Sequence, residues 1–300
     1  MFTLGSGCGA SENSDGTLTH GTHGKGKGKG ACVPKRVTVL LDSRDRDYIR
    51  FPSPNGYVVK LPCNLYNVTS AVLRTAEIPS SFYVFSVARA NTSLKVTING
   101  VSHTITIPDG NYTFTTMAAA LTTALTASFP TVGVSATFND ATYKLTLKLT
   151  DPAQATYAIA VDTTAVNPVI TPAMYGLAYY MGFPPGVVTS GVGSVTAKGA
   201  SSLNPEAYIL VDIDELNQTH QSALYGTGGT QGTVFSKIPV FLNSFGLNVY
   251  DKHLCQNEYP TPIAKVEQLH VALRFHDGTL IDFQGIEHSL TLEVMCTLTR

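Results

Sequence analysis

Residues 266–298 read VEQLHVALRFHDGTLIDFQGIEHSLTLEVMCTL, and this stretch decides the fold class. Apolar and polar residues alternate along its first and last parts, which is the pattern of β-strands with one buried face. Asp277-Gly278 follows the first run and favours a tight turn, because glycine adopts positive φ without a steric clash. We therefore expect a hairpin whose second strand begins at Leu280, and a further strand from His288 to Leu298. The residues expected to face the core are Leu269, Val271, Leu273, Phe275, Leu290, Leu292, Val294, Cys296 and Leu298.

Strand-like runs recur through the rest of the chain, separated by long connections rather than by regularly alternating helices. Thr, Val, Gly and Pro are abundant, which favours strands and turns over long helices. Such runs indicate an antiparallel sandwich or jelly roll. They occupy residues 37–41, 57–61, 68–78, 82–87, 208–213, 234–242 and 247–250.

The middle of the chain, at about residues 89–186, has a different character. Asn99-Gly100 joins two short runs in a predicted hairpin. Residues 114–129 carry apolar side chains every three or four positions, which predicts an amphipathic helix held by packing on a sheet. A second hairpin is expected over residues 134–149, and a Gly/Ser/Thr-rich linker over residues 189–202.

The predicted fold is therefore mainly β. We expect an antiparallel jelly-roll sandwich over residues 36–300, with an inserted subdomain, at about residues 89–186, of β-hairpins plus one amphipathic helix. Residues 1–35 are expected to be a flexible Gly/Lys-rich N-terminal arm, because they contain too little apolar surface to offset the entropy of ordering.

The arm ends in HGKGKGKG at residues 23–30, and its lysines are candidates for contact with a partner. Alternating lysines could bind phosphate groups or an acidic neighbour, since glycine lets the backbone approach closely. The alternative is a solvated tail, and both interpretations remain open. The partner-contact candidates are Lys25, Lys27, Lys29, Lys35 and Arg36.

The charge balance and the cysteines limit the functional classes. The net charge is −1 and charged residues make up 14% of the chain, so its overall field does not steer it to nucleic acid or to a membrane. A nearly neutral surface is more often covered by a partner. We expect no transmembrane helix and no signal peptide, and therefore reduced thiols. Cys63 and Cys296 are expected to be small buried residues.

No catalytic motif is present, and neither a metal site nor a cofactor is expected. The histidines lack a mutual spacing that would define ligands. Asp212, Asp214 and Glu215 cluster at a strand end, where acid–base chemistry is the alternative to an ordinary charged terminus. The run Asp42–Tyr48 alternates charge sign and is expected to form a network at the end of a strand. Sequons at Asn67, Asn91, Asn111 and Asn217 are expected to stay unmodified.

Several stretches between residues 37 and 295 together resemble a known family. The chain is similar to the minor capsid proteins of large icosahedral nucleocytoplasmic DNA viruses, including those of algal viruses. The stretches that carry the resemblance are LDSRDRDY (41–48), PSPNGY (52–57), VLRTAEIPSSFY (72–83), Gly110–Tyr112, Met181–Phe183, Tyr208–Leu216 and DGTLIDFQGIEHSLTLE (277–293).

The resemblance implies a jelly-roll structural protein of the virion, without enzymatic activity, that is assembled in the host cytoplasm. Such a protein would link or cement capsomers, or form the penton, through contacts with the major capsid protein, with other minor capsid proteins or with further copies of itself. The Gly-Lys arm is not part of the resemblance.

Two other functions remain open. A carbohydrate- or receptor-binding jelly roll on the virion surface would need exposed aromatic residues, and the only dense aromatic cluster is Tyr179, Tyr180 and Phe183, next to a short helix expected at 173–181. A hydrolytic enzyme would be built on the carboxylates at 212, 214 and 215, and should lose activity when Asp is replaced by Asn.

Overall fold

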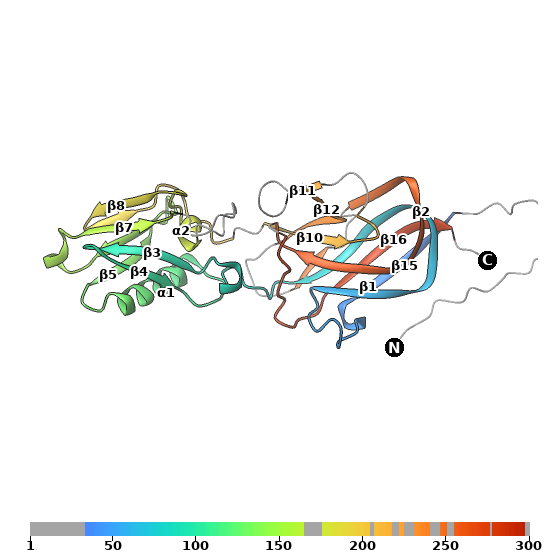
Figure 1. Ribbon diagram of the computed structural model, residues 1–300, viewed down its shortest axis with the longest axis horizontal. Coiled ribbons are helices and arrows are strands. Elements are labelled where there is room, and N and C mark those ends of the chain that lie inside the picture. Colours follow the sequence, from blue (N-terminus) through green and yellow to red (C-terminus); the bar gives the residue numbers. More distant parts are fainter. Residues whose placement is uncertain are drawn as a thin grey trace, which may run out of the picture. The chain divides into compact units, whose positions relative to one another are not determined.

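The computed structural model describes residues 34–164, 176–204, 207–217, 222–224, 231–240, 247–250, 255–276 and 278–297. Its strands pair antiparallel throughout these residues (Figure 1). The prediction of a mainly β, antiparallel, jelly-roll-like fold with an inserted subdomain of hairpins and one amphipathic helix is confirmed. The segment that contains Lys25, Lys27 and Lys29 lies outside the described residues.

The main sheet has seven strands in the order β1-β16-β2-β15-β10-β13, and β14 pairs with the end of β2. Strands that are close in sequence are therefore rarely neighbours in the sheet. Their bounds are β1 Lys35–Asp42, β2 Gly56–Pro79, β10 Tyr208–Ile213, β13 Ser236–Pro239, β14 Leu247–Tyr250, β15 Cys255–Arg274 and β16 Ser289–Thr297.

The 24-residue strand β2 organises the sheet. It pairs with β15 along one side and with β16 along the other, and register shifts occur in both pairings. The sequence predicts two separate strands here, at 57–61 and 68–78. The structure joins them, because Asn67 adopts a positive φ of 47° within a continuous strand instead of ending it.

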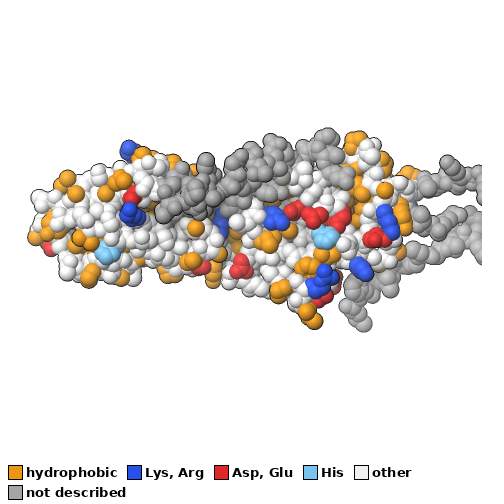
Figure 2. All heavy atoms as spheres, in the orientation of Figure 1, with side chains coloured by type: hydrophobic (Ala, Val, Ile, Leu, Met, Phe, Trp, Pro, Cys, Tyr) orange, Lys and Arg blue, Asp and Glu red, His pale blue; other side chains and the backbone are white. Residues whose placement is uncertain are grey.

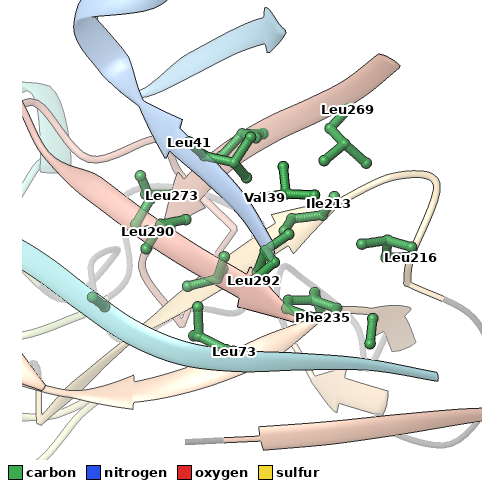
Figure 3. Packing of buried hydrophobic residues seen from close by; sticks show 14 of the residues in the cluster. Val39, Leu41, Leu73, Ile213, Leu216, Phe235, Leu269, Leu273, Leu290 and Leu292 are labelled. Atoms are coloured by element: carbon green, nitrogen blue, oxygen red, sulfur yellow. The ribbon is translucent and has the colours of Figure 1, made fainter. Parts of the chain in front are cut away.

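The apolar inner faces of these strands form one core (Figure 3). Val39 and Leu41 of β1 point toward Leu290 and Leu292 of β16. Leu73 of β2 belongs to the same core. All the residues of 269–297 predicted to face the core are buried, from Leu269 to Cys296, because alternation places every second side chain inside.

The insert contains two smaller sheets, β4-β3-β7-β8 and β5-β6-β9, with the helix α1 packed on them. The predicted turn forms, with positive φ at Asn99 (48°) and Gly100 (83°). The helix α1 starts at a Thr113 cap whose side chain accepts the Thr116 N–H. The elements are β3 Ser93–Ile98, β4 Val101–Thr106, α1 Phe114–Ser128, β5 Val134–Phe138, β6 Leu145–Leu149, β7 Ala158–Asp162, α2 Gly176–Tyr180, β8 Val188–Val192 and β9 Ser194–Thr196.

A second hydrophobic core lies inside the insert. Met117, Leu121 and Leu125 of α1 are fully buried in it, which confirms the predicted apolar face of the helix. Short elements complete the described chain. They are the 3-10 turns η1 Ser43–Asp45, η2 Val87–Arg89 and η3 Pro152–Gln154, and the hairpin of β11 Ser222–Leu224 with β12 Gln231–Thr233.

Two sequence predictions near the main sheet are wrong. The run after the Asp-Gly turn makes a single bridge, between Arg274 and Leu280, instead of a strand. Positive φ at Gln284 (55°) and Gly285 (75°) then redirects the chain toward β16. Cys63 is exposed, because β2 continues through it and turns its side chain away from the core. Cys296 is buried as predicted.

Two predictions at the ends of the insert are also wrong. Residues 82–87 form no strand beyond one bridge between Phe85 and Gly110, since asparagine side chains bind much of their backbone. Residues 189–202, predicted to be a linker, begin with β8 and β9, which pair with β7 and β6. Strand pairing therefore continues beyond residue 186.

Candidate interaction surface

Lys35 and Arg36, the two described partner-contact candidates, begin β1. Lys35 is exposed. The Arg36 side chain is 65% exposed, and its Nε lies 3.2 Å from Oε1 of Glu293. Arg74 binds the same carboxylate oxygen at 2.9 Å. The Glu293 carboxylate thus joins β1, β16 and β2 on the outer face of the sheet, and Arg36 keeps most of its surface in solvent.

The strand β1 lies at an edge of the main sheet. It pairs with β16 from Lys35 to Asp42 without a register shift, and no described strand pairs with its other side. Alternate residues face outward, and among them Leu40 is 72% exposed. An open strand edge with an exposed leucine is a feature that native proteins usually guard, because it can pair with another chain.

The hydrogen-bonding direction of each β1 residue follows from its register. Ser43 continues the β1–β16 register opposite His288, and its N–H donates to the His288 carbonyl oxygen at 3.0 Å. Antiparallel pairs alternate between hydrogen-bonded and non-hydrogen-bonded positions. Odd-numbered residues of β1 therefore direct their backbone groups toward β16. The residues that direct N–H and C=O groups to the open edge are Arg36, Thr38, Leu40 and Asp42.

The loop after β1 is held by a network of charges. Asp42 accepts the Arg44 N–H at 2.9 Å, and the Arg44 side chain lowers the pKa of that carboxyl. Arg46 is the buried member, with a side chain that is only 3% exposed and an Nη1 that lies 2.5 Å from Oε2 of Glu287. Its guanidinium also donates to backbone carbonyl oxygens of the loop and stacks on the Tyr48 ring at 4.1 Å.

The tip of this loop projects apolar surface into solvent. Asp47 Oδ1 accepts the N–H groups of Ile49 and Arg50, at 3.0 and 3.2 Å, and this turn holds the tip. Ile49 is 95% exposed and Tyr48 is 52% exposed. We call residues 48–50 the Ile49 tip. A solvated isoleucine held by a hydrogen-bonded turn is suited to insertion into a pocket of a partner.

His288 lies beneath the loop and is buried. Its Nε2 lies 2.8 Å from the Pro54 carbonyl oxygen, and its ring packs against Tyr57 with centroids 5.6 Å apart. Burial lowers the pKa of His288 to about 4, so the ring is neutral near pH 7. Partial burial alone would raise the pKa of Glu287, but hydrogen bonds from Arg46 and Ser43 bring it below its usual value.

The carboxylates at 212, 214 and 215 do not converge on one point. Asp212 is buried, and its Oδ2 accepts from Nε of Arg274 at 3.0 Å. Glu215 Oε1 instead lies 2.5 Å from Nδ1 of His270. Burial, and then the neighbouring Asp212 and Glu215, raise the pKa of Asp214. The arrangement matches the predicted charged strand end, where Arg274 and His270 each pair with one carboxylate.

The aromatic cluster of the insert faces inward. Tyr180 is 7% exposed and Phe183 is 1% exposed, whereas Tyr179 is 37% exposed. Tyr180 packs edge-on against Phe85, with centroids 5.9 Å apart. Two of the three rings are therefore core residues and cannot stack on a sugar.

Other exposed apolar side chains lie on several elements of the chain, and Figure 2 shows separate orange areas on one face. None of the described helices is long and apolar enough to cross a bilayer. Within the described ranges, no group of three or more His, Cys, Asp or Glu side chains could hold a metal ion. These exposed residues include Val101, Tyr143, Val187, Val188, Val192, Leu247 and Val249.

Comparison with known proteins assigns the chain to a family. Residues 33–206 match the profile of a family of unknown function, DUF5901. The chain belongs to this family. The DUF5901 match includes β1, β2 and the insert, and it ends before β10. No curated protein matches the sequence.

The chain is also similar to a solved structure, the crystal structure of the SeMet-labelled mavirus penton protein. The two share 10% sequence identity and superpose with a TM-score of 0.48, covering 87% of this chain and 99% of that chain.

Sequence reasoning missed the partners of the loop after β1. Ser43 and Arg46 lie inside the DUF5901 match, but Glu287, which binds both, lies 244 positions from Ser43 and outside the match. The repeated Arg-Asp pattern favoured pairing within the loop. Only the burial of Arg46 explains a distant partner, and burial cannot be read from a run of charged residues.

Proposed function

We propose that this protein is a structural component of the virion shell of a large icosahedral DNA virus, where it links or cements capsomers through protein–protein contacts. Its partners would be the major capsid protein and other minor capsid proteins, and it would have no enzymatic activity. The proposal begins from the resemblance of several sequence stretches to minor capsid proteins.

One observation carries the proposal. The first and the last stretches of the resemblance, LDSRDRDY (41–48) and DGTLIDFQGIEHSLTLE (277–293), contact one another in the folded chain. Arg46 and Ser43 of the first both bind Glu287 of the second, at 2.5 Å. Two stretches that resemble the same family, although far apart in the sequence, thus form one local structure.

That structure presents a surface suited to a partner. The Arg46–Glu287 pair and the buried His288 hold the loop from below, and the Ile49 tip stands in solvent above it. The lysines at 25, 27 and 29 and the exposed Lys35 remain candidates for a second contact. A nearly neutral chain with few charges is consistent with a protein that is covered in an assembly.

The chemistry of the described residues supports a structural role more than a catalytic one. Asp212 and Glu215 are each engaged by a basic partner on a neighbouring strand, Arg274 and His270. The aromatic residues proposed for sugar binding belong mainly to the core of the insert. We therefore retain neither the hydrolytic nor the carbohydrate-binding function as the leading proposal.

The experiment is co-sedimentation of the purified full-length chain with shells assembled from the capsid proteins of a virus that encodes it. We expect the chain to bind the shells, and Ile49→Asp to reduce the bound fraction at least tenfold, because it places a charge in the proposed contact. Val192→Asp is the matched control, since Val192 is also exposed, at 71%, but lies in the insert.

Binding of the two variants to the shells distinguishes between the possible results. Loss of binding with Ile49→Asp and not with Val192→Asp would support the proposed contact. A wild-type chain that never sediments with any shell would exclude the structural role. Equal binding by all three proteins would exclude the Ile49 tip as the contact.

A further inference from the structure

The open edge of β1 has a pattern of charge that is complementary to itself. Its outward-facing residues are, in order, Arg36, Thr38, Leu40 and Asp42. A positive charge begins the set and a negative charge ends it, with two uncharged residues between. When two copies of such a strand meet antiparallel, each basic end lies opposite an acidic end.

The backbone permits only certain registers for this meeting. The same residues, at even positions, direct their N–H and C=O groups to the open edge, so hydrogen-bonded pairs must join even positions of the two copies. The register that places Thr38 opposite Leu40 of the second copy also places Arg36 opposite Asp42. It centres Val39 on the two-fold axis and pairs residues 36–42 of the two copies.

We infer that β1 pairs antiparallel with β1 of a second copy, and that this pairing joins the two main sheets into one continuous sheet. The interface is isologous, since each residue meets its partner twice under two-fold symmetry. It stands on β1 alone and does not depend on the proposed role in a virion shell.

The features that usually protect a strand edge from pairing with another chain are absent from the centre of β1. Edge strands are protected by proline, by bulges, by inward-pointing charges or by lysines along the edge. From Val37 to Leu41 the strand has none of these, and its register with β16 is unbroken. Leu40 remains 72% exposed on the outer face.

The side chains on both faces favour the paired state. On the inner face, Val37 is half-buried and packs on the rim of the main core, and pairing would place it opposite Leu41 of the second copy. The apolar inner face would thereby extend across the interface. On the outer face, Leu40 would be covered by Thr38 of the second copy.

The charged ends already have partners in their own chain, and these partners are compatible with pairing. Arg36 binds Glu293 through Nε while 65% of its side chain stays exposed. Asp42 binds the Arg44 side chain through both carboxylate oxygens. In the paired state, Asp42 would lie between Arg44 of its own chain and Arg36 of the other.

The first test is sedimentation equilibrium of the full-length chain over a wide range of concentration. We expect a monomer–dimer equilibrium. Amide hydrogen exchange then locates the interface, because pairing protects the N–H groups of Thr38 and Leu40, whereas Val39 and Leu41 are protected in monomer and dimer alike. A chain that stays monomeric, or a dimer in which exchange at Thr38 and Leu40 is unchanged, would overturn the inference.

Substitutions test the register. Thr38→Pro removes an outward N–H without removing a bond to β16, so it should abolish dimerisation while the chain stays folded by circular dichroism. Arg36→Asp and Asp42→Arg should each weaken dimerisation about tenfold, and the double variant should restore it, because the charges are exchanged. The rescue remains informative if Thr38→Pro fails to fold.

A matched control distinguishes an effect at the strand edge from a general effect of losing a basic partner of Glu293. Arg74→Asp also removes a basic partner of Glu293, but Arg74 lies on the central strand β2. It should leave dimerisation unchanged. If Arg74→Asp weakens dimerisation as much as Arg36→Asp, or if the double charge exchange gives no rescue, the antiparallel β1 register is wrong.

Discussion

Arg46, Glu287 and His288 lie together under the loop that follows β1. The Arg46 side chain is only 3% exposed, so its charge must be paired within the protein. Glu287 supplies the pair, and the adjacent His288 remains neutral because it is buried. Glu287 and His288 are adjacent in the sequence, but Glu287 must be charged to pair with Arg46, whereas His288 is uncharged because it is buried.

The first prediction concerns the buried ion pair. Glu287→Gln should lower the free energy of unfolding by about 3 kcal/mol, because it leaves the Arg46 guanidinium buried without a counter-charge. Urea denaturation followed by circular dichroism measures the change. Glu267→Gln is the control. Glu267 pairs with Lys265 at the surface, where both side chains are well exposed, and its loss should cost less than about 1 kcal/mol. Equal losses of unfolding free energy would show that the Arg46–Glu287 pair stabilises the fold no more than a surface pair does.

The second prediction concerns pH. The pKa of His288 falls from 6.5 in the unfolded chain to about 4 in the folded chain. Between these values the unfolded chain binds more protons, so acid favours unfolding. The stability contributed by neutral His288 is complete above pH 6.5 and is lost progressively down to pH 4, by about 3 kcal/mol.

Measurement of unfolding at several pH values tests this. His288→Gln should flatten the dependence between pH 4 and 6.5, although it will lower stability overall. His103→Gln is a suitable control, since His103 is an exposed residue of the insert. An unchanged slope in His288→Gln would assign the acid sensitivity to other groups.

Two of the four sequon asparagines, Asn91 and Asn111, bind the backbone of residues 82–87. Asn111 accepts the Val84 N–H at 2.7 Å and donates to the Phe82 carbonyl oxygen at 3.0 Å. Asn91 binds the backbone of the same segment on its other side. These amides take the place of a neighbouring strand and explain why the apolar run 82–87 is not one.

The third prediction follows from these bonds. Asn111→Ala should destabilise the chain by about 2–4 kcal/mol, because it removes the partners of two backbone groups of a largely buried segment. Asn139→Ala, which removes bonds in an exposed turn, should cost about 1 kcal/mol. Thermal unfolding of both variants gives the comparison. A smaller loss for Asn111→Ala than for Asn139→Ala would contradict the structural role.

At the scale of elements, the insert depends on a close approach of two backbone segments. Gly182 follows α2 with a positive φ of 83°, and the Gly199 N–H donates to its carbonyl oxygen at 2.9 Å. A Cβ at Gly182 would lie 2.3 Å from the Gly199 carbonyl oxygen. Only glycine satisfies both the conformation and the space.

The fourth prediction is that Gly182→Ala destabilises the insert by more than about 2 kcal/mol, since the strained conformation and the clash add together. Gly186→Ala shares the positive φ, at 71°, but has no atom within 4 Å of the added Cβ. It should therefore cost only the conformational part, about 1 kcal/mol. Similar losses in the two variants would show that the contact with Gly199 has little energetic weight.

The sequence predicts elements whose periodicity is strong and misses those set by distant contacts. The strand β16, the helix α1 and the Asn99-Gly100 turn follow from local patterns, because burial alternates or repeats along the chain itself. The segment after Asp277-Gly278 carries a hairpin pattern but forms one bridge. Its Ile281 and Phe283 pack into the main core instead of continuing the ladder.

The candidate surface was less predictable than the fold. Lys35 and Arg36 could be chosen from charge, but the edge position of β1 depends on the order of strands, which no local pattern reveals. The exposure of Ile49 is equally hidden, since an isoleucine between Tyr48 and Arg50 gives no sign of its environment. Both features need the pairing of β1 with β16.

At the scale of the whole molecule, the described chain holds two hydrophobic cores, one in the main sheet and one in the insert. We propose that the jelly roll of residues 36–300 and its insert, predicted at about 89–186, unfold as separate cooperative units. Each core is closed by its own set of strand pairs, so loss of one set leaves the other intact.

The fifth prediction tests this independence. In native-state hydrogen exchange of the full chain, Gly182→Ala should accelerate exchange of buried amides in α1, such as Leu121, and leave those of β16, such as Leu292, unchanged. Glu287→Gln should do the reverse. If either variant accelerates exchange at both positions equally, the two cores form one cooperative unit.

The pairing of β1 and β2 with β16 has a consequence for synthesis. Ser43 and its partner Glu287 are separated by 244 positions, so the first strands leave the ribosome long before their neighbours exist. The hairpins of the insert are local in sequence and can form while translation continues. During that interval the nascent β1 and β2 have no ladder to join, and they are the segments that a chaperone would need to shield. Only when β16 has emerged can β1 and β2 reach their native positions.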